Sequence, residues 1–119
     1  MNSTRELGRR GEHLAEAHLR GRGYQVVERN VRIGRGEIDL IAYDGGVLVF
    51  VEVKARRSLR FGPPHTSIGG KKRRQLVDLA RRYLAQRRIT ERACRFDTVL
   101  IQWDGASAQI DLIRDAFSA

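Results

Sequence analysis

The sequence predicts a single α/β domain, residues 1–119, built around a mixed β-sheet. Its 119 residues suit one hydrophobic core, and apolar spacing switches between helical and strand periods in the order α-β-β-β-α-β-β. The segment VLVFVEVK, at 47–54, is apolar on both faces, as a central strand is. Because the second helical segment connects this strand to the next one, we expect a right-handed crossover and a parallel strand pair.

The first half of the chain is predicted to form one helix and three strands. Ser3 and Glu6 fit a helical capping box, and apolar residues at helical spacing continue as far as Gly21. β-branched and aromatic residues then predict three strands, at 24–33, 36–43 and 47–54. The turn signal Asp44-Gly45-Gly46 joins the second and third of these as a hairpin.

The second half is predicted to form a long loop, a helix and two strands. Residues 55–70 are rich in Gly, Pro and Arg and have no apolar period, which is typical of a loop. An amphipathic pattern predicts a helix over 71–88, followed by a strand at 94–103 and a short edge strand at 109–113. In the longer strand we expect Asp97 to pair with Arg95 or Arg29, and Trp103 to belong to the core.

Composition and end sequences exclude several classes of protein. The single cysteine, Cys94, rules out an internal disulfide and a cysteine-based zinc cluster. No apolar run approaches the roughly 20 residues of a membrane span, and the N-terminal MNSTRELGRR is charged where a signal peptide is apolar. We therefore expect a cytoplasmic protein with no membrane partner.

Positive charge is concentrated in one part of the chain. The formal net charge is +9, and 54–95 carries fourteen basic residues against two acidic ones. Such a segment predicts a polyanionic partner, nucleic acid above all, because Lys and Arg release counterions from phosphates. The alternative is a solvated surface that merely reflects an Arg-rich composition. The residues expected to contact nucleic acid are Arg56, Arg57, Arg60, Lys71, Lys72, Arg73, Arg74 and Gln75.

Three acids occur in the most apolar hairpin of the chain, where carboxylates are rare because burial is costly. A two-residue turn at Gly45-Gly46 would place Asp39 opposite Glu52, and Glu37 opposite Lys54. A three-residue turn would instead put the two sets on opposite faces of the sheet. We predict the first register.

Opposed carboxylates repel at this spacing unless a cation lies between them. Oxygen ligands favour Mg²⁺ or Mn²⁺, with Asp39, Glu52 and the carbonyl of Val53 as ligands and Lys54 beside a metal-bound water. The alternative is a structural set in which Glu37 pairs with Lys54 and Asp39 accepts from backbone donors.

The spacing of GEID and VEVK resembles the PD-(D/E)XK nuclease signature, an Asp followed by Glu-x-Lys on adjacent strands. The predicted element order is similar to the restriction-endonuclease-like three-layer core of that superfamily. Over nearly the whole chain the sequence is similar to the YraN family of small bacterial proteins. The similar stretches are GRRGEHLAEAHLRGRGY, the RN at 29–30, GEIDLIA, VFVEVKAR and RFD.

This resemblance implies metal ligation by Asp39 and Glu52 and the catalytic lysine role for Lys54. It also implies that Glu12, on the inner side of the first helix, reaches the metal directly or through water. Ile38 stands where the superfamily motif has proline, which ligates nothing. Glu37 has no clear counterpart, so pairing with Lys54 and a supplementary place in the metal shell both stay open.

The first functional hypothesis is a Mg²⁺-dependent endonuclease acting on DNA, including branched or structured DNA. The second is a nucleic-acid-binding module whose nuclease-like site is catalytically silent. A third, an RNA-binding accessory protein, rests only on the Arg-rich segment. The oligomeric state stays open, a homodimer included.

Overall fold

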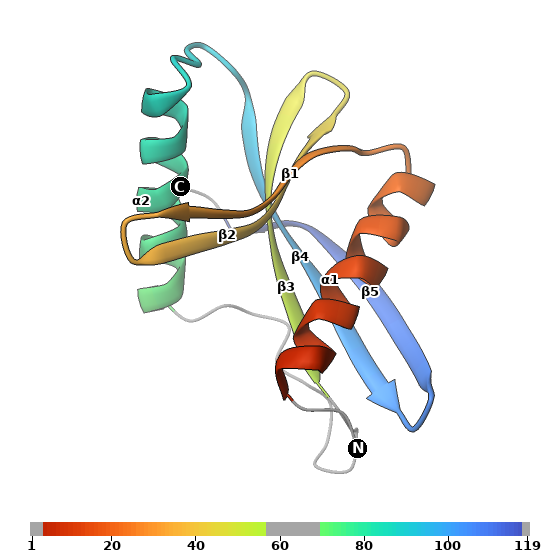
Figure 1. Ribbon diagram of the computed structural model, residues 1–119. Coiled ribbons are helices and arrows are strands. Elements are labelled where there is room, and N and C mark those ends of the chain that lie inside the picture. The colour runs from red at the N-terminus through yellow and green to blue at the C-terminus, as the bar shows by residue number, and fades with distance from the viewer. Residues whose placement is uncertain (1–3, 57–69, 118–119) are drawn as a thin grey trace.

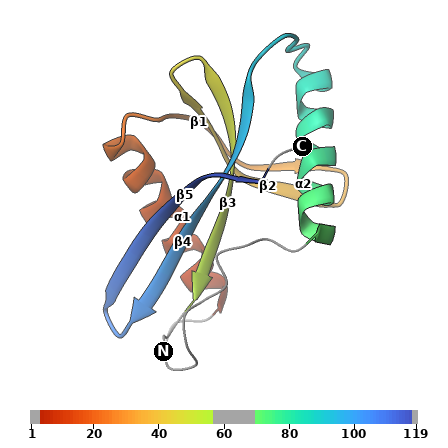
Figure 2. The same ribbon diagram turned by 180° about the vertical axis from the view of Figure 1, so that it is seen from behind.

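The computed structural model describes residues 4–56 and 70–117. One helix, α1 (Thr4–Gly21), covers one face of a five-stranded sheet, and a second, α2 (Gly70–Gln86), covers the other (Figures 1 and 2). The strands are β1 (Gln25–Ile33), β2 (Gly36–Asp44), β3 (Val47–Arg56), β4 (Cys94–Asp104) and β5 (Ser107–Phe117). This α/β architecture is compatible with a restriction-endonuclease-like core. No helix in the described ranges is both long and apolar enough to cross a membrane.

The strands lie in the spatial order β1-β2-β3-β4-β5, and only β3 and β4 run parallel. The sheet is therefore mixed, as predicted, because α2 carries the chain back between these two strands. The doubly apolar β3 occupies the middle of the sheet, where both of its faces are covered.

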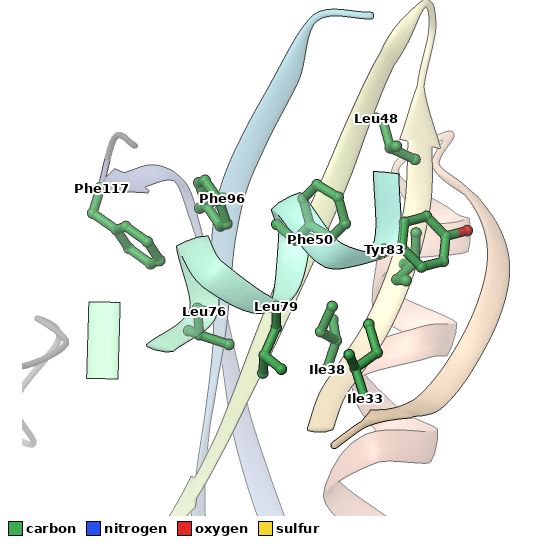
Figure 3. Close-up of a cluster of buried hydrophobic side chains, with 11 residues drawn as sticks. Ile33, Ile38, Leu48, Phe50, Leu76, Leu79, Tyr83, Phe96 and Phe117 are labelled. Carbon is green, nitrogen blue, oxygen red and sulfur yellow. The ribbon is translucent and has the colours of Figure 1, made fainter. Parts of the chain in front are cut away.

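Two apolar clusters fill the space between the layers. Beneath α1, Ala15 and Leu19 pack against alternate residues of the central strands, such as Val49 and Val51. Beneath α2, Leu76 and Leu79 pack against the other face (Figure 3). The alternation along β3 therefore assigns each face of the sheet to one helix.

Strand β5 is longer than the sequence predicts, spanning Ser107–Phe117 rather than 109–113. Near its end, Asp115 has a positive φ of 52°, which interrupts the alternation of side chains between the two faces of the sheet. Tertiary packing extends the strand, because the ring of Phe117 stacks 4.6 Å from that of Phe96 on β4. The predicted cap Ser3 and most of the predicted loop lie outside the described residues.

A fully buried carboxylate, Asp97 on β4, is linked to β5 and to Tyr24, which lies between α1 and β1. It accepts hydrogen bonds from Tyr24 Oη at 2.7 Å, from Arg95 Nε at 2.8 Å and from the backbone N–H of Asp115 at 2.9 Å. The expected pairing with Arg95 is confirmed, and the pairing compensates the burial of charge. Trp103, also expected in the core, is 6% exposed.

Candidate metal site and nucleic-acid interface

The hairpin of β2 and β3 has the predicted register. Leu40 pairs with Val51, and the pairing continues to Asp44 and Val47 at the turn. The ladder ends at Leu40 and Val51, however, so Asp39 and Glu52 lie immediately beyond its last pair. The predicted acidic residues therefore lie where the two strands separate, rather than within the paired sheet.

Strand β2 bends at Asp39. Ile38 belongs to the cluster under α2, whereas Leu40 belongs to the cluster under α1, although residues two apart in a regular strand share a face. Opposite Asp39, on β1, Asn30 has a φ of 50°, a left-handed conformation that Asn tolerates better than most residues. The simple alternation assumed from the sequence is therefore wrong across this position.

The bend aims the side chain of Asp39 at β3. Its Oδ2 accepts a hydrogen bond of 2.9 Å from the backbone N–H of Val53, a donor that the ended β2–β3 ladder no longer uses. Backbone donors at a strand end were the structural alternative for this residue. The bond leaves the rest of the carboxylate in contact with Glu52, so this alternative and a ligand role are compatible.

Asp39 and Glu52 form a hydrogen-bonded carboxyl pair. Burial, followed by the charge of Asp39, raises the pKa of Glu52 to about 7. Burial also raises the pKa of Asp39, while the Val53 N–H opposes that rise. The second oxygen of Glu52, Oε2, is buried and has no hydrogen-bond partner. The pair thus holds an unsatisfied buried acceptor, which is costly unless a further positive group reaches it.

Two lysines lie near this pair. Lys54 follows Glu52 on β3 at the spacing that puts both on one face, and burial lowers the pKa of its ammonium group. Lys72, from the first turn of α2, places Nζ 3.7 Å from Glu52 Oε1. The sequence predicted Lys72 only as a nucleic-acid contact, because the rotation of α2 about its axis depends on packing.

Glu12 approaches the carboxyl pair from α1. Burial, then the charges of Asp39 and Glu37, raise its pKa, and a hydrogen bond to Asn30 acts in the opposite direction. The expectation that Glu12 lies on the inner side of the helix is confirmed by this proximity. Glu37 is electrostatically close to both Asp39 and Glu12, so the structure places it among the acids.

The neighbouring Arg29-Asn30 segment is fixed to α1 by two glutamates one helical turn apart. Glu16 forms an ion pair with Arg29, while Glu12 bonds to Asn30. The sequence indicated Arg29 and Asn30 only as part of the family resemblance and did not predict these contacts. A cavity of about 200 Å³ opens here, lined by Arg9, Glu12, His13, Glu16, Arg29, Asn30 and Leu40.

A further buried group beside the site is Thr98, which the sequence analysis missed. It pairs in parallel register with Glu52, is completely buried, and its Oγ1 has no hydrogen-bond partner. A threonine within a buried strand gives no sequence signal of its own. Only the β3–β4 register reveals that it neighbours Glu52.

The donor chemistry fits a hard divalent cation. Two carboxylates meet, one of their oxygens is unsatisfied, and Lys72 shows that a positive group is already attracted to Glu52. Among the described residues, no three His, Cys, Asp or Glu side chains converge as a complete ligand set. A cation here would therefore use Asp39 and Glu52 with backbone oxygen and water, and Glu12 would act through water.

The predicted nucleic-acid contacts cluster at the start of α2 and at the end of β3. Lys71, Arg73, Arg74 and Gln75 are exposed on the first turns of α2. Arg56, at the last position of β3, is exposed as well. Arg57 and Arg60 lie outside the described residues. Two of the predicted contacts reach this strand end: Lys72 lies 3.7 Å from Glu52 Oε1, and Arg56 is electrostatically close to Lys54.

Comparison with known proteins places the sequence in a family. Residues 11–101 match the model of "Uncharacterised protein family UPF0102". The chain belongs to this family, which is the YraN family that its sequence resembles. The matched region contains Glu12, Glu37, Asp39, Glu52 and Lys54.

The family relationship covers almost the full length of the chain. A UPF0102 protein of Geotalea uraniireducens is 45% identical over 96% of this chain and 91% of its own length. One from Symbiobacterium thermophilum is 46% identical over 98% and 99%, and one from Moorella thermoacetica is 43% identical over 97% and 98%. These relatives are similar in length to this UPF0102 chain as well as in sequence.

Proposed function

We propose that this protein is a nucleic-acid-binding, metal-dependent phosphodiester hydrolase, an endonuclease that prefers DNA, including branched or structured DNA. The observation that carries the proposal is the contact between the carboxyl groups of Asp39 and Glu52, with Glu52 Oε2 buried and unsatisfied. Burying two carboxyl groups side by side is unfavourable for folding, and a bound cation would offset the repulsion between their charges.

The proposed ligands are Asp39, Glu52 and the backbone carbonyl of Val53, with Mg²⁺ or Mn²⁺ as the cation. When bound, the cation supplies a nucleophilic water at neutral pH and neutralises charge on the phosphate. Lys54, on the same face of β3 as Glu52, orients the water and offsets charge that develops on the phosphate. Glu12 and Glu37 hold further water at the acidic side of the site.

The surface around the site supports a nucleic-acid substrate. The exposed basic residues of the first turns of α2 lie beside Lys72, which itself contacts Glu52. A phosphate backbone that follows these cations as far as Lys72 would come close to Glu52. The preference for DNA follows from the resemblance to PD-(D/E)XK nucleases.

The proposal is tested by titrating Mn²⁺ into wild type and Asp39→Asn, and by incubating both with single-stranded, duplex and branched DNA. We expect saturable binding by wild type that Asp39→Asn loses, because one of two acidic ligands is gone. We expect Lys54→Ala to reduce cleavage by about 10²-fold or more while DNA affinity changes little.

An Asp111→Asn variant, altered on the exposed surface of β5, is the matched control and should bind Mn²⁺ and cleave DNA like wild type. Metal-independent DNA binding with no cleavage of any of the three substrates would favour the alternative, a catalytically silent nucleic-acid-binding module. Absence of saturable Mn²⁺ binding would contradict the metal site itself.

A further inference from the structure

A second cavity lies on the opposite side of α1 from the acidic residues. It has a volume of about 490 Å³ and lies between α1 and the β4–β5 hairpin. We call it the hairpin groove, and its lining residues are Arg10, His13, Leu14, Trp103, Ala106 and Ala108. Its size is that of a small-molecule site, and none of these six residues is acidic.

Trp103 lines the hairpin groove and has an unsatisfied donor. The side chain is 6% exposed, and its indole Nε1 is buried without any hydrogen-bond partner. A buried N–H normally finds an acceptor, because leaving it unpaired costs free energy. Because Nε1 is buried, an acceptor atom of a ligand in the groove could pair with it only if the indole ring shifted.

Arg10 gives the hairpin groove a planar cation. Its guanidinium carbon lies 4.7 Å from the centre of the Trp103 ring. Guanidinium groups stack on aromatic and heteroaromatic planes, and this pair presents such a stacking surface beside small alanine side chains. The groove thus combines a stacking plane with an apolar wall.

The hairpin groove lies at the same end of the sheet as Lys54 but on the other face, because Trp103 packs under α1 whereas Glu52 and Lys54 face α2. The helix is so close to β3 that a Cβ at Gly11 would lie 3.1 Å from Ala55 Cβ, one residue beyond Lys54. Ala55 pairs with Ile101, and Trp103 follows two residues later, about 7 Å further along the strand. The strand end of β3, the first turns of α1 and the β4–β5 hairpin lie at the same end of the molecule in both views (Figures 1 and 2).

We propose that the hairpin groove binds one unstacked nucleobase of a nucleic-acid strand. A nucleobase combines a flat aromatic face with carbonyl or ring-nitrogen acceptors, which match the plane and the N–H groups of the Arg10 guanidinium. The inference rests on the nucleic-acid binding proposed above and adds to it the substrate class: strands that carry an unpaired base.

Trp103 makes the test direct, because it is the single tryptophan of the chain. The full chain is titrated in EDTA with a ten-residue oligothymidylate and with a matched oligomer whose central residues are abasic. Indole fluorescence reports the hairpin groove, and the anisotropy of a labelled oligomer reports binding itself. We expect the base-bearing oligomer to change the indole emission saturably and to bind about fivefold tighter or more. We expect the abasic oligomer to bind without the emission change.

Two variants separate the hairpin groove from the rest of the surface. Ala108→Leu fills the groove and should remove the preference for the base-bearing oligomer. Ala85→Leu, the same change at an exposed position of α2, should preserve the preference. Arg10→Lys keeps the charge but loses the plane, and we expect it to reduce the preference as well.

Binding of both oligomers with equal affinity and unchanged emission would overturn the inference and leave the proposed function intact. Equal emission changes from both oligomers would overturn it too. Failure to bind either oligomer would overturn the inference together with the nucleic-acid binding on which it rests. An emission change that depends on protein concentration without DNA would assign the hairpin groove to a second copy of the chain instead.

Discussion

Glu52 shows how a candidate site can oppose folding. Its carboxyl is mostly buried against Asp39, and one of its oxygens has no hydrogen-bond partner. Burial raises its pKa from 4.5 to about 7. Between these two values the folded chain keeps a proton that the unfolded chain has released. The free energy of unfolding therefore falls as pH rises through this window and stays low above pH 7.

Replacing Glu52 by Gln removes this ionisation, so Glu52→Gln should be more stable than wild type above pH 7 in metal-free buffer. We expect a difference of up to about 3 kcal/mol, because each pKa unit corresponds to roughly 1.4 kcal/mol. The difference should shrink towards pH 4.5. Denaturant unfolding at pH 5 and pH 8 measures it.

Asp111→Asn, on exposed β5, serves as the control and should match wild type at both values of pH. A Glu52→Gln protein that is less stable than wild type at pH 8 would show that Glu52 contributes to folding as a paired charge. Mg²⁺ should raise the stability of wild type more than that of Glu52→Gln if the proposed site binds it.

At the scale of elements, the β1–β2 hairpin packs closely against α2 at Gly36. Gly36 pairs with Ile33 at the hairpin end, and a Cβ at Gly36 would lie 2.7 Å from both methyl carbons of Leu79. Leu79 is 4% exposed, so its side chain has little room to move (Figure 3). The glycine lets the helix pack on this part of the hairpin, three residues before Asp39.

Gly36→Ala should therefore destabilise the fold by about 1–3 kcal/mol, the usual range for overpacking a core. In a Leu79→Ala background the same substitution should cost clearly less, because the clashing methyl groups are absent. Denaturant unfolding of the four proteins in this double-mutant cycle measures the coupling.

Gly46→Ala is the matched control, since no atom lies within 4 Å of a Cβ placed there. We expect its free energy of unfolding to lie within about 0.5 kcal/mol of wild type. Equal costs of Gly36→Ala in both backgrounds would mean that the contact with Leu79 does not limit the packing.

At the scale of the whole molecule, the acids of the candidate site lie beside a helix, α2, that is rich in exposed basic residues. The acids Glu12, Glu37, Asp39 and Glu52 gather around the end of the β2–β3 pairing. Exposed cations flank that region on α2. The exposed cations would attract a polyanion, whereas the group of acids would repel its phosphates until a metal cation is bound there.

Arg73 and Arg74 are expected to contribute to DNA affinity through phosphate contacts. Replacing both by alanine should lower the slope of log Kd against log salt by about 2, and should weaken binding to all sequences alike. Fluorescence anisotropy with one labelled duplex between 50 and 200 mM salt, values typical of such series, measures the change.

The control is the double variant Arg20→Ala and Arg22→Ala, which removes the same charge at the C-terminal end of α1. It should leave the salt slope close to that of wild type. An equal fall in both variants would mean that net charge, and not the α2 surface, determines binding.

The sequence by itself determined the order of elements, the mixed sheet and the hairpin register. These depend on local signals, such as apolar periodicity and the Asp44-Gly45-Gly46 turn, which act over a few residues. The same signals were enough to single out Asp39, Glu52 and Lys54, because charged residues in an apolar strand contradict its pattern. The full length of β5 escaped prediction, since the stacking of Phe117 on Phe96 joins distant parts of the chain.

Only the tertiary structure decided how the site residues meet. The bend at Asp39, the hydrogen bond from Val53, the approach of Lys72 and the burial of Thr98 beside Glu52 all join different elements. Such contacts depend on where a strand pair ends and on how a helix is rotated when it packs. Neither is encoded in the spacing of residues along one element, because both follow from the balance of packing across the whole sheet.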